Sequence, residues 1–450
     1  MSDRIEINSA YIEQIASLIE ANNSAELSLI IADLHIADIA EIIDDLSIDN
    51  AHFLFDLIEE EKSAPVLVEL EDDTLEEILS DLTAKEIAEE VIDNLESDDA
   101  ADVIGKLSQD KKEEVLALIE DIERASDIND LLTYPEDTAG GLMAKELIKV
   151  NENWTTIQCL KEMRKQAEDL KEVYTIYVVD DNDKLLGILS LRKLLLIERA
   201  TAIKDIIFTE IISVKATEDD EHVANIMNKY DLIALPVVDD LNRLIGRITI
   251  DDVMDVAKDE AEKDYQMASG ISEDVESSDT AWELTRARLP WLLIGMIGGL
   301  LGAKVIGIFD LSGDNFELAF FIPLIAAMGG NVGVQSAAIV VQGLANDSLK
   351  MENIFQKLVK ELGVGLLNGI ICSIIILGAA FSLGYSLALS LTVSISLFAV
   401  IVFAAVFGTF IPLTLEKYNI DPALATGPFI TTVNDVLGLF IYFMIGQAIL

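Results

Sequence analysis

The amino-acid sequence predicts a multidomain membrane protein: an α-helical domain and an α/β region, followed by a bundle of five membrane-spanning helices. The chain has 450 residues, of which 51% are hydrophobic, yet its formal net charge is −49. Five of its 31 Lys and Arg residues and nine of its 80 Asp and Glu residues lie in 289–450, a net charge of −4, which leaves −45 for residues 1–288. The chain therefore has an acidic soluble part and an apolar part, and its length allows two to four domains.

The charge of the soluble part limits its partners. Nucleic-acid binding needs patches of Lys and Arg that pair with phosphates, so no nucleic acid is expected. Adsorption on anionic lipid is disfavoured for the same reason, whereas cations are favoured. The two cysteines, Cys159 and Cys372, lie in unlike segments, which fits a reducing compartment. Residues 1–20 are polar and acid-rich and do not resemble a cleavable signal peptide.

The first domain, residues 1–130, is predicted to be a stack of short amphipathic helices. Leucines recur there at intervals of roughly twelve residues, separated by polar units with Ile or Val pairs, and this pattern favours a small helical superhelix. The leucines that carry the pattern are Leu34, Leu46, Leu70, Leu82, Leu95 and Leu107.

The next region contains a duplication. Residues 176–190 form an apolar run, a polar turn and a second apolar run, and 235–249 repeat this pattern 59 residues later. Helical stretches precede both copies, so each module is predicted as a helix, two strands and a further helix. The modules, 131–200 and 201–256, resemble a tandem pair of cystathionine-β-synthase (CBS) domains.

The CBS resemblance implies a regulatory region that takes an adenine nucleotide through a Ser/Thr-x-x-Asp motif at the ribose. The second module has this motif in Thr249 and Asp252, which are the predicted nucleotide contacts, with ATP as the expected regulator. The first module has Ser190 but Lys193 in place of the aspartate, which weakens the expectation there.

A polar helix and a linker, 257–284, are predicted to connect the CBS pair to a transmembrane domain, 285–450. Five apolar stretches, each long enough for the ~20 residues of a spanning helix, run over 289–309, 319–345, 361–383, 388–413 and 422–447. Lys and Arg flank the first span and lie between spans two and three and between four and five. The positive-inside rule then predicts that the soluble part is cytoplasmic.

Polar residues inside the predicted spans indicate a path for cations, because each is costly in lipid unless it faces an interior or a cavity. The second span contains the segment 329–336, rich in Gly and with polar side chains. The fifth contains Asp435, the only carboxylate deep within any span. Asp435 is therefore the predicted cation-binding residue.

Motifs for catalysis are not found. His35, His52 and His222 lack metalloprotease spacing, and the sequence has no G-x-x-x-x-G-K-[ST] phosphate loop. The protein is not expected to be an enzyme.

Taken together, the domain order, the segment 329–336 and the run 421–435 resemble the MgtE family of magnesium channels and transporters. The resemblance implies a homodimer in the cell (inner) membrane with a central pore, and Mg²⁺ as both the transported and the regulatory ion. It implies Asp435 as the pore carboxylate, with Asn331, Gln335 and Thr431 lining the path. Hydrated Mg²⁺ held by carboxylate and carbonyl oxygens is physically reasonable.

The resemblance also implies regulatory Mg²⁺ ligands in the cytoplasmic part. They are Asp98 and Asp102 in the first domain; Asp219, Glu221 and Asp231 in the second CBS module; Asp252, Asp255, Glu260 and Asp264 along the connecting helix; and Asp421 at the inner mouth. Lys263 stands where a further family carboxylate is expected.

The predicted function is import of Mg²⁺ down its electrochemical gradient, closed by Mg²⁺ on the acidic cytoplasmic domains. Facing carboxylates repel one another and divalent ions bridge them, so high internal Mg²⁺ favours the compact, closed state. Two alternatives stay open: a CBS-regulated secondary transporter of another divalent cation, or a non-conducting sensor of Mg²⁺ or nucleotide.

Overall fold

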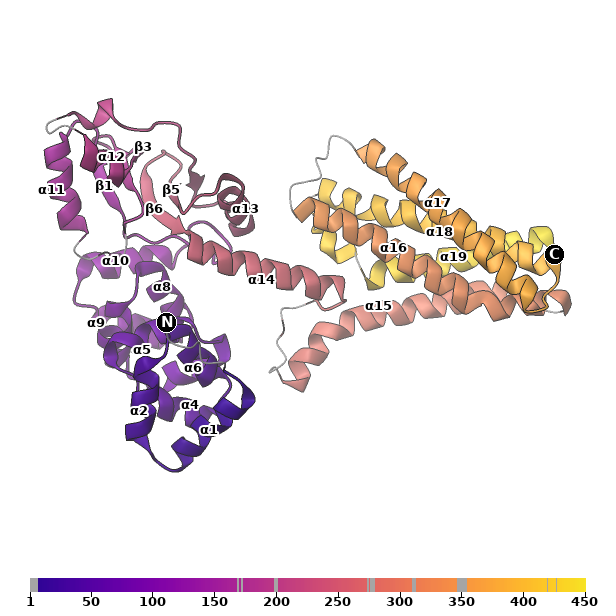
Figure 1. Ribbon diagram of the computed structural model, residues 1–450, viewed down its shortest axis with the longest axis horizontal. Helices are drawn as coiled ribbons and strands as arrows, with labels where there is room; N and C mark the ends of the chain where they lie inside the picture. The colour runs from indigo at the N-terminus through magenta and orange to yellow at the C-terminus, as the bar shows by residue number, and fades with distance from the viewer. Residues whose placement is uncertain are drawn as a thin grey trace. The chain divides into compact units, whose positions relative to one another are not determined.

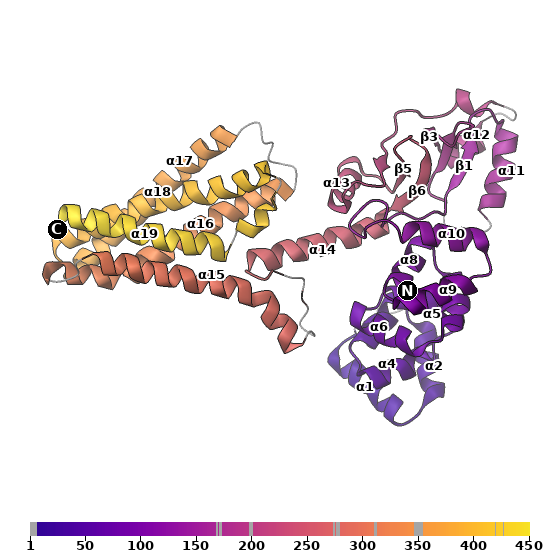
Figure 2. The ribbon, with the colours of Figure 1, turned by 180° about the vertical axis from the view of Figure 1, so that it is seen from behind.

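The computed structural model describes residues 7–167, 170, 173–197, 201–272, 275, 280–309, 313–345, 354–418, 420–425 and 427–450. The chain forms two compact units, Met1–Ala257 and Lys258–Leu450. Figures 1 and 2 show the helices and strands of each unit from opposite sides.

The first part of unit one is a stack of short helices, as predicted. Four of the helices α1–α10 begin after a residue whose side chain caps the helix: Asp121, for example, accepts hydrogen bonds from the amides of Glu123 and Arg124 at the start of α10. Their apolar faces meet in one core. The elements are α1 (Ser9–Glu20), α2 (Ser24–Asp33), α3 (Ile36–Asp44), α4 (Ile48–Phe55), α5 (Glu60–Val68), α6 (Asp72–Asp81), α7 (Ala84–Glu86), a π-helical turn η1 (Ile87–Val91), a 3₁₀ turn η2 (Ile92–Asn94), α8 (Ser97–Gly105), α9 (Gln109–Leu118) and α10 (Ile122–Leu131). We call α1–α10 the N domain.

Two small sheets follow, one for each predicted module. The first has the order β1 (Ile148–Asn151), β2 (Ile176–Val179), β3 (Leu185–Leu189), and the second β4 (Val214–Lys215), β5 (Ala234–Val238), β6 (Leu244–Thr249). In both, the first pair is parallel and the second antiparallel. The helices are α11 (Thr156–Gln166), α12 (Leu191–Leu196), the 3₁₀ turn η3 (Ile203–Asp205), α13 (Asp220–Tyr230) and α14 (Ile250–Ala268).

The two hairpin turns of the modules pair with each other. Asp183 and Asn242 occupy equivalent turn positions and both have positive φ, 60° and 67°. The amide of Leu185 donates to the carbonyl of Asn242 at 3.0 Å, and the amide of Leu244 donates to that of Asp183 at 2.9 Å. This reciprocal pairing confirms that the sequence repeat is a structural repeat.

One helix continues from the second module toward the membrane part. Helix α14 is continuous from Ile250 to Ala268, so it crosses the boundary that we predict at 256/257. Its first turn carries the predicted nucleotide contact Asp252, and its later turns carry Glu260 and Asp264.

Among the residues of unit two that the structure describes, five helices are long and apolar enough to cross a membrane, which agrees with the predicted number. They are α15 (Ala281–Ile308), α16 (Ile322–Ala345), α17 (Ile354–Ser382), α18 (Leu387–Lys417) and α19 (Pro428–Ile449), with 3₁₀ segments η4 (Gly313–Phe321) and η6 (Pro422–Ala425). Helix α18 is the most buried of the five and packs against α16, α17 and α19, which lie side by side in Figures 1 and 2.

The start of the last span differs from the prediction. We predict a span over 422–447, but α19 begins at Pro428 and residues Pro422–Ala425 form a separate 3₁₀ turn. Gly427, with φ 53° and ψ −122°, interrupts the helical path. Proline then occupies the first helical position, where its missing N–H costs nothing.

Candidate cation path and regulatory acid clusters

The side chain of Asp435 lies on α19 next to a glycine of α16. A Cβ atom added to Gly330 would lie 3.8 Å from Oδ1 of Asp435 and 3.5 Å from Cγ2 of Thr431. Gly330 thus lets the two helices approach where α19 carries its carboxylate. The hydroxyl of Thr431 donates to the carbonyls of Gly427 and Pro428, so it is used within its own helix.

Asn331 and Gln335 are exposed on α16, four residues apart and therefore on one helix face. In a bilayer, a polar face turned toward lipid is unfavourable, and such faces normally meet protein or water. The face that holds two of the predicted pore-lining residues therefore needs a polar cover.

Asn434 is a site residue that the sequence prediction missed. It is 1% exposed, and its Nδ2 donates to the carbonyl of Gly329 at 3.3 Å. Its Oδ1 is buried without a hydrogen-bond partner among the described residues. Asn434 fixes α19 to α16 one residue before Asp435. The small residues of 329–333 are the sequence signal for this contact, but they do not identify its partner.

A second contact inside the membrane part was also missed. The buried hydroxyl of Ser336 on α16 donates to Oε1 of Glu361 on α17 at 2.6 Å. A carboxylate within a spanning helix is costly unless it has such a partner. This bond joins α16 to α17 one residue beyond Gln335.

In unit one, the predicted N-domain ligands come together with Asp252. We call Asp98, Asp99, Asp102, Glu136 and Asp252 the α8–α14 acid cluster. Burial, together with the charges of Asp99 and Asp252, raises the pKa of Asp98 well above its usual range. Asp102 is solvent-exposed on α8, yet partial desolvation by its neighbours, together with the charges of Asp99 and Glu136, raises the pKa of its carboxyl to about 7. Burial also raises the pKa of Asp252. These carboxylates repel one another in the ionised form, and a cation would relieve the repulsion.

In unit two, three further predicted ligands lie close enough to interact electrostatically. We call Glu260, Asp264 and Asp421 the α14–mouth cluster. Burial raises the pKa of Asp264, and the charges of Asp421 and Glu260 add to the shift. Lys263 pairs with Glu260 at 2.7 Å, so one carboxylate of this cluster already has a cationic partner.

The remaining predicted ligands lie apart. Asp219 caps the start of α13, where its side chain accepts from the amide of His222, and Asp231 ends the same helix in the left-handed conformation. These positions are separated by the length of an 11-residue helix, roughly 16 Å at 1.5 Å per residue. Glu221 lies in the first turn of α13, and Asp255 is exposed on α14. Over the described ranges, the single chain brings no group of three or more Asp, Glu, His or Cys side chains close enough to hold a metal ion.

The predicted nucleotide contacts bind each other. The hydroxyl and the amide of Thr249 donate to Oδ2 of Asp252 at 2.6 and 3.1 Å. Asp252 is half-buried beside the carboxylates of α8, and its Oδ2 atom is already occupied within the motif. In the first module, Nζ of Lys193 donates to the carbonyl of Ile206 at 2.6 Å.

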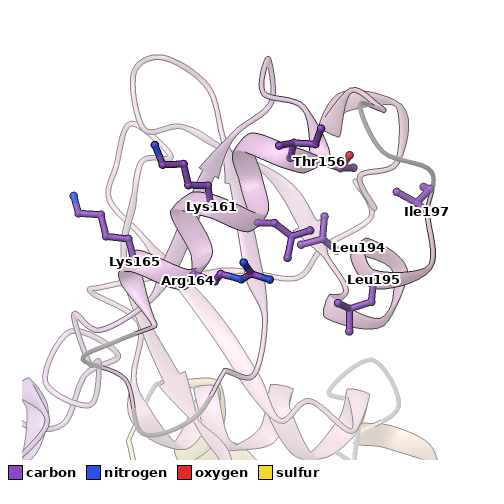
Figure 3. Close-up of a pocket in the computed structure, with 9 residues that line it drawn as sticks. Thr156, Lys161, Arg164, Lys165, Leu194, Leu195 and Ile197 are labelled. Atoms are coloured by element: carbon purple, nitrogen blue, oxygen red, sulfur yellow. The ribbon is translucent and has the colours of Figure 1, made fainter.

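The first CBS module has a cavity of about 650 Å³ between α11 and α12. Figure 3 shows Lys161, Arg164 and Lys165 along α11 on one side and Leu194 and Leu195 on the other. None of the predicted site residues lines this cavity.

Three family models match the chain. The MgtE intracellular N domain matches residues 34–137, the CBS domain matches 139–198 and 203–259, and MgtE, described as a divalent cation transporter, matches 322–445. The magnesium transporter MgtE of Bacillus subtilis is 34% identical over 319 residues, 71% of each chain. The chain belongs to the MgtE family.

Other MgtE proteins support the same assignment. The magnesium transporter MgtE of Thermus thermophilus is 34% identical over 328 residues, 72% of this chain and 73% of that protein. The crystal structure of the cytosolic domain of the Mg²⁺ channel MgtE in complex with ATP is 31% identical, with a TM-score of 0.50, and covers 54% of this chain and 99% of that one. As in MgtE, a soluble N-terminal region precedes the membrane part here, and these relatives are transporters rather than enzymes.

Proposed function

We propose that this MgtE protein conducts Mg²⁺ into the cell along its electrochemical gradient and that Mg²⁺ on the soluble domains closes it. The observation that carries the proposal is Asp435, a carboxylate on a membrane-spanning helix beside Gly330. The named relatives are magnesium transporters. The membrane potential of an inside-negative cell lowers the free energy of an entering divalent ion by about 4.6 kcal/mol per 100 mV, because each charge contributes ~2.3 kcal/mol. Influx therefore needs no ATP.

The pore is proposed to form between two copies of the chain. A two-fold axis would bring the exposed polar face of α16, with Asn331 and Gln335, against its counterpart and away from lipid. The same axis would place two copies of Asp435 around one path. This arrangement supplies the polar cover that the described residues of a single chain do not give this face.

Closure is proposed to depend on the two acid clusters. In the α8–α14 acid cluster, desolvation and mutual repulsion raise the carboxyl pKa values. In the α14–mouth cluster, the same two causes raise the pKa of Asp264. Divalent cations would bind the ionised carboxylates and favour the conformation in which they are close. A ligand shifts an equilibrium only through such a difference in affinity between the two states. We propose four further Mg²⁺ ligands, whose sites would be completed by side chains of the partner subunit: Asp219, Glu221, Asp231 and Asp255.

ATP is proposed as a regulator on the likeness to the ATP-bound cytosolic domain of the Mg²⁺ channel MgtE. In this chain, the hydroxyl of Thr249 donates to Asp252, whose charge acts on Asp98 and Asp102 of α8. Ribose binding to Asp252 would therefore require the N domain to move away. We place the protein in the cell membrane, with unit one in the cytoplasm, on the distribution of Lys and Arg around the spans.

Mg²⁺ uptake into liposomes that contain the purified protein and a trapped Mg²⁺-sensitive dye tests this proposal. Wild type is compared with Asp435→Asn, and with Glu317→Gln as a matched control at an exposed carboxylate outside the path. We expect wild-type and Glu317→Gln uptake, loss of uptake in Asp435→Asn, and suppression by Mg²⁺ on the side of the soluble domains. Unchanged uptake in Asp435→Asn would remove Asp435 as the essential ligand. Strong pH dependence with weak Mg²⁺ dependence would favour a coupled transporter instead.

A further inference from the structure

A buried network of charged side chains joins the N domain to the CBS pair next to the α8–α14 acid cluster. Its centre is Arg247 on β6, which is 5% exposed. Nη2 of Arg247 donates to Oε2 of Glu96 at 2.8 Å, and Nε donates to the backbone carbonyl of Glu146. The guanidinium also lies over the ring of Tyr174, 5.4 Å from its centroid. Arg247 of the second CBS module thus holds the N domain and the start of the first module together.

The carboxylate of Glu146 makes the second half of the network. Oε2 accepts from the hydroxyl of Ser97 at 2.6 Å and from its amide at 3.2 Å. Oε1 lies 3.6 Å from Nη1 of Arg124, and Nη2 of Arg124 donates to the carbonyls of Ile92 and Leu95. The charged groups of the network, two guanidinium groups and two carboxylates, therefore balance without a metal ion.

The network anchors the start of α8 through Glu96 and Ser97. Glu96 is the residue that precedes this helix and Ser97 is its first residue, so both anchored residues lie directly before Asp98. The same helix carries Asp98, Asp99 and Asp102, whose carboxylates repel one another and Asp252. One end of α8 is thus held by balanced charges, whereas the carboxylates of the following turns repel one another and Asp252.

We propose that Arg247 and Glu146 are positioning residues that form a metal-independent pivot for the N domain. The inference rests on the proposed closure by Mg²⁺. When divalent cations leave the acid cluster, the repelling carboxylates separate, while the contacts of Glu96 and Ser97 persist. The N domain then rotates about the start of α8 instead of detaching. With Mg²⁺ present, the pivot holds Asp98 and Asp102 within reach of Asp252 and so raises the affinity of the cluster.

Distances between pairs of spin labels in the full-length protein test the pivot. One label is placed at Lys161, exposed on α11 of the first CBS module, and the other at Asn94, beside the pivot, or at Asp49, on α4 of the N domain. Cys159 and Cys372 are replaced by alanine. On removal of Mg²⁺ by EDTA, we expect the 94–161 distance distribution to stay unchanged and the 49–161 distribution to broaden and shift. Equal changes in both pairs would show that the N domain detaches and would overturn the pivot.

Arg247→Met gives the second arm, with Arg243→Met as the control. Arg243 is exposed and pairs with Asp239 inside the second CBS module, so its loss changes the charge equally without touching the N domain. We expect Arg247→Met to broaden the 94–161 distribution with and without Mg²⁺. We also expect it to raise the Mg²⁺ midpoint of the 49–161 change by about tenfold, equivalent to about 1.4 kcal/mol. Wild-type behaviour of Arg247→Met would contradict the inference.

Glu96→Gln serves if Arg247→Met does not fold, because it removes one charge of the same pair and keeps an oxygen acceptor. It should broaden the 94–161 distribution, and an unchanged distribution would contradict the pivot. If neither distance responds to Mg²⁺ in wild type, the proposed closure by Mg²⁺ is wrong, and the variants alone then decide whether Arg247 anchors the N domain.

Discussion

The side-chain amide of Asn434 on α19 donates to the backbone carbonyl of Gly329 on α16 over 3.3 Å. This bond joins the two helices one residue before Asp435 and one residue before Gly330. The close approach depends on small residues of α16, because a Cβ atom added to Gly333 would lie 1.9 Å from Nδ2 of Asn434 and 2.7 Å from Cγ2 of Ile430.

Gly333→Ala should therefore destabilise the membrane unit and disturb the path. The added methyl group must displace Asn434 or Ile430, and overpacking of this kind typically costs about 1–3 kcal/mol. Gly363→Ala on α17 is the matched control, since no described atom lies within 4 Å of its Cβ position. Thermal unfolding in detergent and Mg²⁺ uptake into liposomes should both fall in Gly333→Ala and stay near wild type in Gly363→Ala. Equal behaviour of the two variants would contradict the close packing at Asn434.

The α8–α14 acid cluster predicts a stability that depends on pH. The pKa of Asp102 rises from 3.8 to about 7 in the folded protein, first because its neighbours partly desolvate this otherwise exposed residue and then because of the charges of Asp99 and Glu136. The folded state therefore retains a proton that the unfolded state releases. This contribution is complete below pH 3.8 and is lost as the pH rises through about 7.

In EDTA, the unfolding temperature of unit one within the full-length protein should thus be higher at pH 5.5 than at pH 8. Mg²⁺ should raise it more at pH 8, because protons and Mg²⁺ compete for the same carboxylates. Asp102→Asn should reduce both dependences. Differential scanning fluorimetry with and without Mg²⁺ measures these effects, and equal stabilisation by Mg²⁺ at the two pH values would argue against cation binding at this cluster.

The α14–mouth cluster predicts a variant that escapes closure. Asp264→Asn removes one of the carboxylates that repel one another in this cluster, so Mg²⁺ should hold α14 near Asp421 less tightly. Glu262→Gln, exposed on the same helix, is the control. Uptake by Asp264→Asn should persist at Mg²⁺ concentrations, on the side of the soluble domains, that stop uptake by wild type and Glu262→Gln. A normal inhibition curve for Asp264→Asn would show that this cluster does not control closure.

The exposed face of α16 predicts access from water. Asn331→Cys and Gln335→Cys should react with a positively charged methanethiosulfonate reagent, and the reaction should block uptake, because these positions line a hydrated path. Ile374→Cys is the control, since Ile374 is exposed on α17 among apolar neighbours and should face lipid. Failure of the reagent to reach Asn331→Cys and Gln335→Cys, with uptake intact, would place this face against lipid or protein rather than water.

Much of the fold follows from local sequence patterns. The five apolar runs predicted the five helices in the described part of the chain that are long enough to span a membrane, and the repeated apolar pattern predicted β2, β3, β5 and β6. The family resemblance named Asp98 and Asp102 as a pair, and both lie on α8 in the cluster with Asp252. Short strands such as β4, with two residues, carry too little pattern to be recognised.

The contacts that complete the site depend on residues far apart in the sequence. Arg247 and Glu96 are 151 positions apart, and Asn434 lies 105 positions after Gly329. No local period relates such residues, so their pairing emerges only when helices and strands pack. The observed start of α19 differs from the predicted start of the fifth span because Gly427 has a positive φ. An apolar run in the sequence does not reveal this backbone conformation.

Current measured across a planar bilayer that contains the purified protein tests the central claim most directly. With Mg²⁺ as the only permeant cation and a gradient across the bilayer, wild type should carry a current that reverses near the Mg²⁺ equilibrium potential. Adding Mg²⁺ on the side of the soluble domains should close it, and Asp435→Asn should carry no Mg²⁺ current. An Asp435→Asn current equal to that of wild type, or no Mg²⁺ current from correctly folded wild type at low Mg²⁺, would contradict the proposal that this chain conducts Mg²⁺ past Asp435.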